Sequence, residues 1–575
     1  MKLAEALSLI QKAPAGGEDY PVTLACGFTP LHLQNYLAAH LQKALPKRKV
    51  RVLTGLYDDV AGTLEQFAQS ESQVGALVLE WADLDPRLGY RNLGGWGPRV
   101  ASSIIQSVEA TFGRLQAAID AIPSSSKLVV SLPTLPLPPG FHTTGWQASQ
   151  AELELEESAA GFALRIASRL PVLLVNRQQL DNISPLHTRY DFRSDLHTGF
   201  PYTSSHADAL GGALARLIEA PQPKKGLITD LDDTLWLGLV GEDGHEGVSW
   251  DLASHSHLHG LYQQMLHALA DQGVLIAIAS KNSPEVTEKA LSRPDLAIAR
   301  DKIFPVEVHW EPKSGSVERI LKIWNIGADS VVFVDDSAME LEEVRAAHPG
   351  IECILFPKSD YSAGLAFLRR LRDLFGKPWV SEEDAYRLQS IRQVERAKTN
   401  GTGSLAEQFL STTEALLTLE YDPPASDRRI VELVNKTNQF NLNGDRYTGA
   451  ELHRALEQPG SFMLALSYED KFGPLGKIAV IGGKREGAKL RIETWVMSCR
   501  AFSRRIEYQC LAQLFRRFNP EEIVLNFKAT PRNGPLQDFL SSILGRPPEP
   551  EAVLERGVFE KNCPKLYQRV VERNG

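Results

Sequence analysis

Residues 226–234 read Gly-Leu-Ile-Thr-Asp-Leu-Asp-Asp-Thr, so two carboxylates stand two positions apart directly after a short apolar run. We expect Gly226–Thr229 to form a buried strand that ends where its sheet meets solvent. Side chains two positions apart in an extended segment point to the same face, so Asp230 and Asp232 can address one substrate and one cation together. The stretch indicates an α/β fold with a phosphoryl-transfer site at a strand end.

Two later apolar runs also end in polar residues. Val274–Ala279 precedes Ser280, and Val331–Val334 precedes Asp335 and Asp336. Helical stretches lie before and between these runs, as right-handed crossovers between parallel strands require. Because ligands bind at the carboxyl ends of the strands in an open parallel sheet, we expect the polar residues after all three runs to converge.

Each acid of this group has a role that phosphoryl transfer requires. Asp230 is the expected nucleophile, which attacks phosphorus to give an aspartyl phosphate. Asp232 is the expected general acid and then the general base. An oxygen-rich shell suits Mg²⁺, a hard cation, and the predicted metal ligands are Asp230, Asp232, Asp335 and Asp336.

The phosphoryl oxygens also need hydrogen-bond donors. Lys313 is expected to neutralise charge that would otherwise repel the attacking carboxylate. A salt-bridged surface lysine is the alternative, because Lys302 and Lys322 stand nearby in the sequence. The predicted phosphate-binding residues are Thr234, Ser280, Asn282 and Lys313.

The composition excludes several classes of protein. The chain has 575 residues, of which 43% are hydrophobic and 23% are charged, as in ordinary multidomain globular proteins. A formal net charge of −9 argues against general binding to nucleic acid. No apolar run reaches the length of a membrane span or of a signal-peptide core, and the five cysteines show no metal or disulfide spacing. We therefore expect a cytoplasmic protein without membrane or nucleic-acid partners.

Shifts in composition predict three domains, at 1–222, 223–378 and 379–575. In the first, apolar runs alternate with helical stretches, which predicts an α/β layer structure. A proline-rich stretch in this domain, Pro133–Pro139, is expected to be a surface loop. The expected strands of this domain are Pro21–Ala25, Lys49–Thr54, Ala76–Glu80, Lys127–Ser131 and Pro171–Val175.

Two segments of the later domains lack a clear apolar period. Gly238–Gly247 is glycine-rich and is expected to form a hairpin after the aspartates. The stretches between the expected strands are too short to hold a separate cap domain over the site. Glu382–Lys398 is expected to form a polar helix that leads into the last domain.

Asp-Leu-Asp-Asp-Thr, Ser280, Lys313 and Asp335-Asp336 follow one another in an order that resembles the motifs of the haloacid dehalogenase (HAD) phosphatase superfamily. Further segments resemble its FkbH-like branch, subfamily IIIC: Trp236, Gly238, Val240, Gly241–Gly244, Glu311–Ser314, Asn435–Leu442 and Met497–Arg500. Such proteins are taken as glyceryl transferase/phosphatases of polyketide biosynthesis. The resemblance implies a 1,3-bisphosphoglycerate donor, removal of a phosphate, and transfer of the glyceryl group to the phosphopantetheine thiol of an acyl carrier protein.

The C-terminal region resembles a GNAT-like acyltransferase fold. Leu490–Met497 is expected to be a strand and Ile506–Phe518 the next helix, with Cys499 between them. Cys499 is the predicted carrier of the glyceryl group as a thioester, and a buried structural cysteine is the alternative. The run Asn435–Leu442 is either a wall of the transfer site or a structural turn. The predicted transfer-site residues are Asn438, Gln439, Asn441 and Arg500.

The N-terminal domain resembles the SGNH-hydrolase-like region that precedes the HAD unit in longer family members. Cys26–Thr29 stands where such a hydrolase places its Gly-Asp-Ser nucleophile, and no serine is present there. Asp195 and His197 are similar to a catalytic pair, although a loop hydrogen bond is the alternative. We expect this domain to be non-catalytic.

Two other functions stay open for the whole chain. One is a stand-alone Mg²⁺-dependent phosphatase with inert flanking domains. The other is a carrier-docking scaffold, which the full set of catalytic residue types argues against. One set of C-terminal arginines is either a docking patch for an acidic carrier or a solvated helix face: Arg504, Arg505, Arg516 and Arg517.

Overall fold

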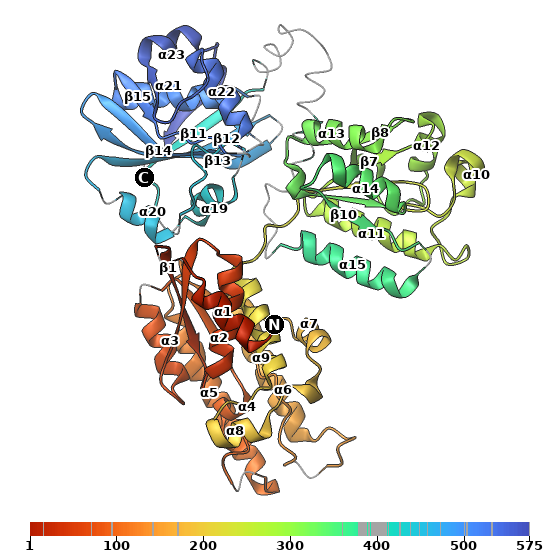
Figure 1. The fold of residues 1–575 in the computed structure, drawn as a ribbon, viewed down its shortest axis with the longest axis vertical. Helices are drawn as coiled ribbons and strands as arrows, with labels where there is room; N and C mark the ends of the chain where they lie inside the picture. The colour runs from red at the N-terminus through yellow and green to blue at the C-terminus, as the bar shows by residue number, and fades with distance from the viewer. Residues whose placement is uncertain are drawn as a thin grey trace. The chain divides into compact units, whose positions relative to one another are not determined.

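The structure is a computed structural model of the chain, and it forms two compact units, Met1–Pro221 and Gln222–Gly575 (Figure 1). The first unit ends beside the predicted boundary after residue 222. The predicted boundary at 378/379 lies outside the described residues and stays a prediction. The structure describes all residues except 15, 71, 94–95, 141–142, 170–171, 359, 378–387, 389–390, 393–410, 412, 425–426, 438, 448, 457, 472, 499–500, 502–503, 531–532 and 574–575.

The first unit is built on a parallel five-stranded sheet in the order β2-β1-β3-β4-β5. Each strand lies on one of the five apolar runs that the sequence marks as strands, so the predicted α/β layer is confirmed. The strands are β1 (Glu18–Ala25), β2 (Arg48–Thr54), β3 (Val74–Val78), β4 (Lys127–Ser131) and β5 (Val172–Leu174).

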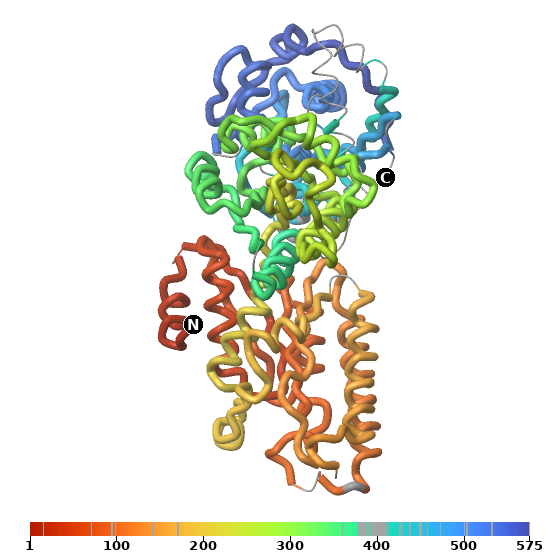
Figure 2. Tube along the Cα trace, turned by 90° about the vertical axis from the view of Figure 1, so that its right-hand side faces the viewer, coloured from red at the N-terminus to blue at the C-terminus, as the bar shows by residue number. Residues whose placement is uncertain are grey.

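Helices cover both faces of this sheet. One apolar core lies under α1 (Leu3–Gln11), α2 (Leu31–Ala44) and α9 (Ser204–Ile218), and the other lies under α3 (Val60–Gln69), α5 (Ala101–Asp120) and α6 (Gln150–Ala167). Figure 2 shows α5 and α6 side by side, and the rings of Phe112 and Phe162 stack between them with their centroids 4.5 Å apart. Three shorter helices complete the unit: α4 (Trp81–Leu84), α7 (Arg177–Ile183) and α8 (Phe192–Thr198).

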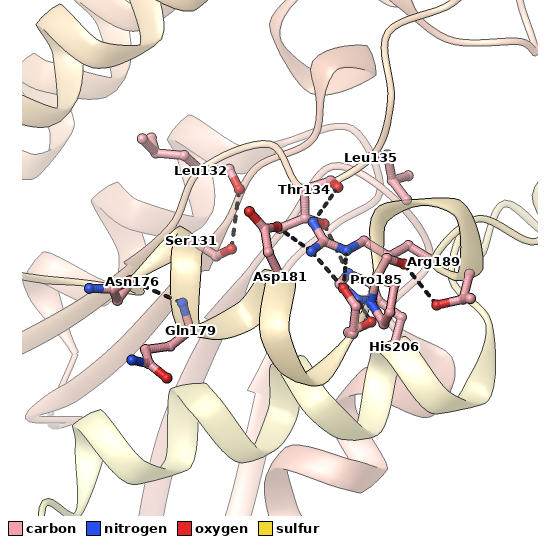
Figure 3. Close-up of polar contacts among 12 residues, drawn as sticks. Ser131, Leu132, Thr134, Leu135, Asn176, Gln179, Asp181, Pro185, Arg189 and His206 are labelled. Carbon is pink, nitrogen blue, oxygen red and sulfur yellow. Dashed lines mark hydrogen bonds and ion pairs between the residues drawn. The ribbon is translucent and has the colours of Figure 1, made fainter. Parts of the chain in front are cut away.

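The loop after β4 differs from its prediction. Pro133–Pro139 has no regular secondary structure, as predicted, but Thr134 is buried rather than at the surface. Arg189, which is fully buried, donates from Nη1 to the Thr134 carbonyl at 2.8 Å and from Nε to the Ser184 carbonyl at 2.8 Å (Figure 3). His206 bonds the Thr134 hydroxyl at 2.9 Å. The loop can be buried because these side chains satisfy its polar groups.

The second sheet has five parallel strands in the order β10-β9-β6-β7-β8. The three apolar runs predicted from the sequence form its centre, and this prediction is confirmed. The two edge strands had no apolar run strong enough to predict them. The strands are β6 (Gly226–Thr229), β7 (Leu275–Ser280), β8 (Ile303–Val308), β9 (Val331–Asp335) and β10 (Glu352–Leu355).

Alternate residues of these strands enter two separate cores. One core holds α11 (His257–Asp271) and α15 (Tyr361–Phe375), and the other holds α13 (Lys313–Trp324) and α14 (Ala338–Ala347), on the opposite face (Figure 1). Because α13 and α14 begin at the carboxyl edge of the sheet, their first turns face the strand ends that carry Asp230 and Asp335. A further helix, α12 (Pro284–Leu291), follows β7.

The predicted hairpin over Gly238–Gly247 is wrong. The segment forms helix α10 (Val240–Gly247), whose Gly244 has a positive φ of 75° that kinks it. The Asp232 carboxylate accepts a hydrogen bond from the Val240 backbone N–H at 3.1 Å, which satisfies one of the free donors at the start of the helix. A glycine-rich sequence can therefore begin a helix here because an acid outside the helix caps it.

The last part of the chain carries a mixed seven-stranded sheet in the order β16-β15-β14-β13-β12-β11-β17. The predicted strand and helix after residue 490 are present, whereas the GNAT-like identity stays a prediction. The helices that follow and flank the sheet are α19 (Arg428–Lys436), α20 (Gly449–Leu456), α21 (Ile506–Phe518), α22 (Gly534–Leu544) and α23 (Arg556–Asn562). The strands are β11 (Leu416–Tyr421), β12 (Ser461–Asp470), β13 (Gly473–Glu486), β14 (Lys489–Met497), β15 (Glu522–Leu525), β16 (Ala552–Glu555) and β17 (Arg569–Arg573).

Most of the predicted polar helix over Glu382–Lys398 lies outside the described residues. Of its described residues, Leu388 and Ile391 pack against the core under α13 and α14. The described helices include none that is long and apolar enough to cross a membrane.

Candidate active site

A cavity of about 190 Å³ opens at the carboxyl edge of the second sheet, beyond the ends of β6, β7 and β9. The structure brings most of the predicted site residues together around it. Of the site residues predicted within 223–378, Thr234 and Asn282 do not line it. The lining residues are Asp230, Asp232, Asp233, Leu239, Ser280, Lys281, Lys313, Asp335, Asp336, Ser337 and Glu340.

Three carboxylates in this cavity are placed to share a cation. One oxygen each of Asp230, Asp335 and Asp336 lies within 4.8 Å of the other two. Asp335 is fully buried at the end of β9, and Asp230 is almost so at the end of β6. Hard carboxylate oxygens on a rigid sheet edge fit Mg²⁺, which keeps several waters and takes few protein ligands.

Asp230 carries the clearest sign of an incomplete site. Its buried Oδ1 lies 3.0 Å from Lys313 Nζ as an ion pair, but it has no hydrogen-bond partner of good geometry among the described residues. Burial raises the pKa of the Asp230 carboxyl, while the Lys313 ammonium opposes that rise. Burial and the Asp230 charge raise the pKa of Asp335 to about 7. A bound cation would favour the ionised form of both acids.

Asp232 is not part of this group of acids. Its Oδ1 accepts from the Trp236 indole N–H at 2.9 Å and from the Val240 backbone N–H at 3.1 Å, and its Oδ2 accepts from Asn282 Nδ2 at 2.9 Å. The structure therefore groups three of the four predicted metal carboxylates and leaves Asp232 out, because its oxygens are taken by nitrogen donors. Asp232 still lines the cavity, as a general acid must.

Lys313 is a buried cation rather than a surface lysine. It begins α13 and ion-pairs with Asp230 at 3.0 Å, with Asp335 at 2.6 Å and with Glu340. Burial lowers the pKa of its ammonium, but the carboxylates of Asp230 and Asp335 outweigh that effect and the net shift is upward. Lys313 therefore stays charged and holds two of the three grouped acids. The competing Lys302 instead pairs with Asp271.

The other predicted phosphate-binding residues differ in whether they line the cavity. Ser280, the last residue of β7, lines the cavity and helps to lower the pKa of Asp230. Asn282 does not line the cavity and instead donates a hydrogen bond to the Asp232 carboxylate. Thr234 is fully buried, and its hydroxyl has no hydrogen-bond partner within the part of the chain that the structure describes. The structure thus gives Ser280 access to a ligand and gives Asn282 a supporting position.

Sequence reasoning missed three charged residues of the site. Glu340 lies in the first turn of α14 and bridges Lys313 and Lys281, with Lys281 Nζ 2.9 Å from its Oε1. Lys358 at the rim lies 3.0 Å from Asp233 and 2.8 Å from Asp336. A usable signal for Glu340 was an acid in the first helical turn after a carboxylate-bearing strand end.

The predicted transfer site is only partly described. Cys499, Arg500 and Asn438 lie outside the described residues, and Gln439 is half-buried in a turn. Asn441 is buried, and its Oδ1 accepts from the Gly444 backbone N–H at 2.8 Å, so the structure shows its role in a turn. Its role in transfer stays a prediction.

One arginine of the expected C-terminal patch is internal. Arg504 is buried, lies 3.8 Å from Asp470 and faces the Tyr468 ring. Arg517, in contrast, is exposed. A buried, paired guanidinium contributes neither to a docking surface nor to a solvated face, so both expectations are wrong for Arg504.

The N-terminal residues singled out earlier lie at the carboxyl edge of the first sheet. Burial raises the pKa of the Cys26 thiol, which donates to the Phe28 carbonyl at 3.4 Å and lines a separate cavity of about 80 Å³. Asp195 accepts from the Tyr190 hydroxyl at 2.7 Å. Asp195 and His197 both belong to α8, where residues two apart do not face each other, so they form no dyad.

No family model matches the chain, and no curated protein matches it. Among solved structures, the chain is similar to the N-terminal part of the protein BF1531 from Bacteroides fragilis, which contains a phosphatase domain complexed with Mg. The two share 18% identity and a TM-score of 0.51 over 66% of this chain and 100% of that one, which is a likeness of fold.

Two weaker matches carry no argument about this chain. One is an uncharacterized protein from Corynebacterium glutamicum, with 14% identity and a TM-score of 0.19 over 27% of this chain and 98% of that one. The other is a putative UDP-N-acetylglucosamine 2-epimerase from Listeria monocytogenes, with 11% identity and a TM-score of 0.14 over 67% and 98%.

Proposed function

We propose that this chain is a Mg²⁺-dependent phosphatase of the HAD type that forms an aspartyl phosphate on Asp230. The observation that carries the proposal is the grouping of Asp230, Asp335 and Asp336 within 4.8 Å of one another, beside the buried Lys313. The similar fold of a phosphatase domain complexed with Mg supports the same reaction and the same cation.

The residues divide the reaction between them. A carboxylate oxygen of Asp230 attacks phosphorus, and the bond from phosphorus to the leaving oxygen breaks. Asp232 gives its proton to that leaving oxygen and then takes one from the water that cleaves the aspartyl phosphate. Lys313 and the Ser280 hydroxyl balance the charge on the phosphoryl oxygens. Mg²⁺, held by Asp230, Asp335 and Asp336, supplies further charge neutralisation when it is bound.

The contacts of Asp232 support its role by fixing its position in the cavity. Three nitrogen donors, from Trp236, Val240 and Asn282, fix the carboxylate without a neighbouring cation in direct contact. An acid that is oriented in this way can present a proton to one fixed point of the cavity. Asp230, by contrast, is paired with Lys313, which suits its proposed role as the nucleophile that attacks phosphorus.

The finer function rests on the sequence resemblance. We propose that the phosphoryl donor is of the 1,3-bisphosphoglycerate type and that the glyceryl group passes through Cys499 to the thiol of an acyl carrier protein in polyketide biosynthesis. The FkbH-like run Asn435–Leu442 and the Met497–Arg500 segment support this function. A stand-alone phosphatase is the competing function, since phosphate release needs neither segment.

Phosphate release from p-nitrophenyl phosphate with and without Mg²⁺ tests the phosphatase. We expect Asp230→Asn to abolish release and to prevent a phosphoryl mass increase on the protein. Asp301→Asn, an exposed acid in the turn before β8, is the matched control and should keep full activity. Release that survives Asp230→Asn would overturn the mechanism.

Loading of a carrier protein separates the two finer functions. With an acyl phosphate donor and a phosphopantetheinylated carrier, Cys499→Ala should lose carrier loading and keep phosphate release. Arg517→Glu, at one of the two exposed arginines of the expected patch, tests carrier docking separately. Loading that is equal in the wild type and in Cys499→Ala would exclude the thioester.

A further inference from the structure

We propose that Lys281 is a specificity-determining residue that binds a second anionic group of the phosphorylated substrate, a carboxylate or second phosphate close to the reacting phosphoryl group. The inference rests on the proposed phosphatase function and concerns the same cavity. Lys281 follows Ser280 directly after β7 and lines that cavity.

Of the eleven described residues that line the cavity, Lys281 and Lys313 are the two cations. Lys313 is 4% exposed and is shared by three carboxylates, so it cannot leave them without stranding buried charge. Lys281 is 33% exposed, and among the described residues its ammonium pairs with Glu340 alone, at 2.9 Å. The two lysines therefore differ in how freely they can change partners.

Glu340 keeps the free-energy cost small when Lys281 exchanges its carboxylate partner for a substrate anion. One of its oxygens binds Lys281 and the other binds Lys313. If the Lys281 ammonium turns towards a substrate anion, Glu340 keeps the Lys313 partner and no buried charge is left unpaired. Because Lys281 is partly solvated and has a flexible four-carbon stem, its reorientation costs little.

The position of Lys281, directly after Ser280 in the cavity lining, sets where the second anion lies. An apolar cavity of about 150 Å³ holds a benzene molecule. The volume of about 190 Å³ has room for a phosphoryl group and a few further heavy atoms, and the rest of a larger substrate would lie outside its open mouth. A compact substrate, in which a second anion stands a few bonds from phosphorus, matches this space and the position of Lys281 directly after Ser280.

Competition between two matched esters tests the inference. Phosphoglycolate and ethyl phosphate differ in that one carries a carboxylate where the other carries a methyl group. Each is measured as an inhibitor of p-nitrophenyl phosphate hydrolysis by the full chain with Mg²⁺. We expect wild-type protein to bind phosphoglycolate about tenfold more tightly, as a charge-assisted hydrogen bond predicts.

Substitution of Lys281 should remove this preference. In Lys281→Met and Lys281→Gln, the ratio of the two inhibition constants should fall to near unity. Lys289→Met, at an exposed lysine on α12, is the matched control and should keep the wild-type ratio. Thermal unfolding of each variant checks that the fold is intact.

Glu340→Gln gives a second readout, which a structural role of Lys281 would not produce. It frees Lys281 from its carboxylate partner, so phosphoglycolate should bind more tightly than to the wild type. At the same time Lys313 loses one partner, so kcat for p-nitrophenyl phosphate should fall. Binding and turnover therefore move in opposite directions.

Each outcome has one meaning. A wild-type ratio near unity, or a tenfold ratio that survives both Lys281 variants, overturns the inference while the phosphatase function stands. If the wild-type protein releases phosphate from none of the three esters, the proposed function fails and this inference fails with it.

Discussion

The chain contains two parallel five-stranded sheets. Their carboxyl edges differ in whether certain buried polar groups there have hydrogen-bond partners. At the first, Arg189 and His206 bond the loop after β4 from both its carbonyl and its hydroxyl side. At the second, Asp230 keeps a buried oxygen without a hydrogen-bond partner of good geometry among the described residues. Buried polar groups that satisfy one another stabilise a fold, whereas a buried group left incomplete is available to a ligand.

The largest expected effect comes from the incomplete edge. Asp230→Asn should lower kcat for phosphate release by about 1,000-fold or more, because the nucleophile is lost. Thermal stability of the metal-free protein should not fall, since the change removes a buried charge next to Asp335. Steady-state kinetics and calorimetry measure the two quantities. A clear loss of stability together with the loss of activity would contradict the difference proposed between the two edges.

At the carboxyl edge of the first sheet, a substitution should lower stability and leave activity unchanged. Arg189→Met leaves the carbonyls of Thr134 and Ser184 without their donors and should destabilise the first unit by about 3 kcal/mol. Phosphate release should be unchanged at temperatures below unfolding. Urea titration measures the first quantity, with Arg193→Met, at an exposed position on α8, as the control.

Cation binding should depend on pH at the second edge. Burial and Asp230 raise the pKa of Asp335 to about 7, and a cation requires the ionised carboxylate. The dissociation constant for Mg²⁺ should therefore rise by about tenfold for each unit that the pH falls below about 7. Calorimetric titration with MgCl₂ between pH 5.5 and pH 8 measures it. A constant affinity over that range would contradict the assignment of Asp335 as a ligand.

The metal-free protein should show the opposite trend in stability. Because the folded pKa of Asp335 lies above its unfolded value of 3.8, the folded state binds more protons, and this contribution to stability is lost as pH rises from about 4 through about 7. Added Mg²⁺ should cancel the loss. Melting temperatures with EDTA and with Mg²⁺ at both ends of the range separate the two effects.

The smallest expected effect is at Asp83 in the first unit. Burial raises the pKa of its carboxyl to about 8, so the same sign applies and stability is lost as pH rises from about 4 through about 8. Asp83→Asn keeps the shape of the neutral acid and should flatten this slope by a few degrees in the melting temperature. Mg²⁺ should have no influence on it. A slope that persists in the variant would assign it to another group.

The sequence was sufficient for the strands of the first sheet, for the three central strands of the second sheet and for the acids that follow them. Buried parallel strands are continuous apolar runs, and β6, β7 and β9 are of that kind. Their order along the chain and the right-handed crossover rule then place Asp230, Ser280 and Asp335 at one edge. Edge strands β8 and β10 are only partly buried, so the same pattern is too weak to find them.

Local patterns could not predict the contacts made across the chain. The hairpin expected over Gly238–Gly247 is a helix because Asp232, outside the segment, caps Val240. The loop after β4 is buried in part because Arg189, some fifty residues later, donates to the Thr134 carbonyl. Glu340 was missed for a related reason, since an acid in a first helical turn is usually explained by the helix dipole.

The contact between Asp232 and α10 has a consequence for how the proposed activity could be lost. The proposed proton donor Asp232 is held by the main chain of a short glycine-rich helix, by one indole and by Asn282, whereas the acids grouped for a cation lie at the ends of strands of the sheet. A lineage that shortened or rewrote residues 236–247 would keep the grouped acids and lose two of the three contacts that orient Asp232. Such a descendant would bind phosphate esters as a receptor and never turn them over.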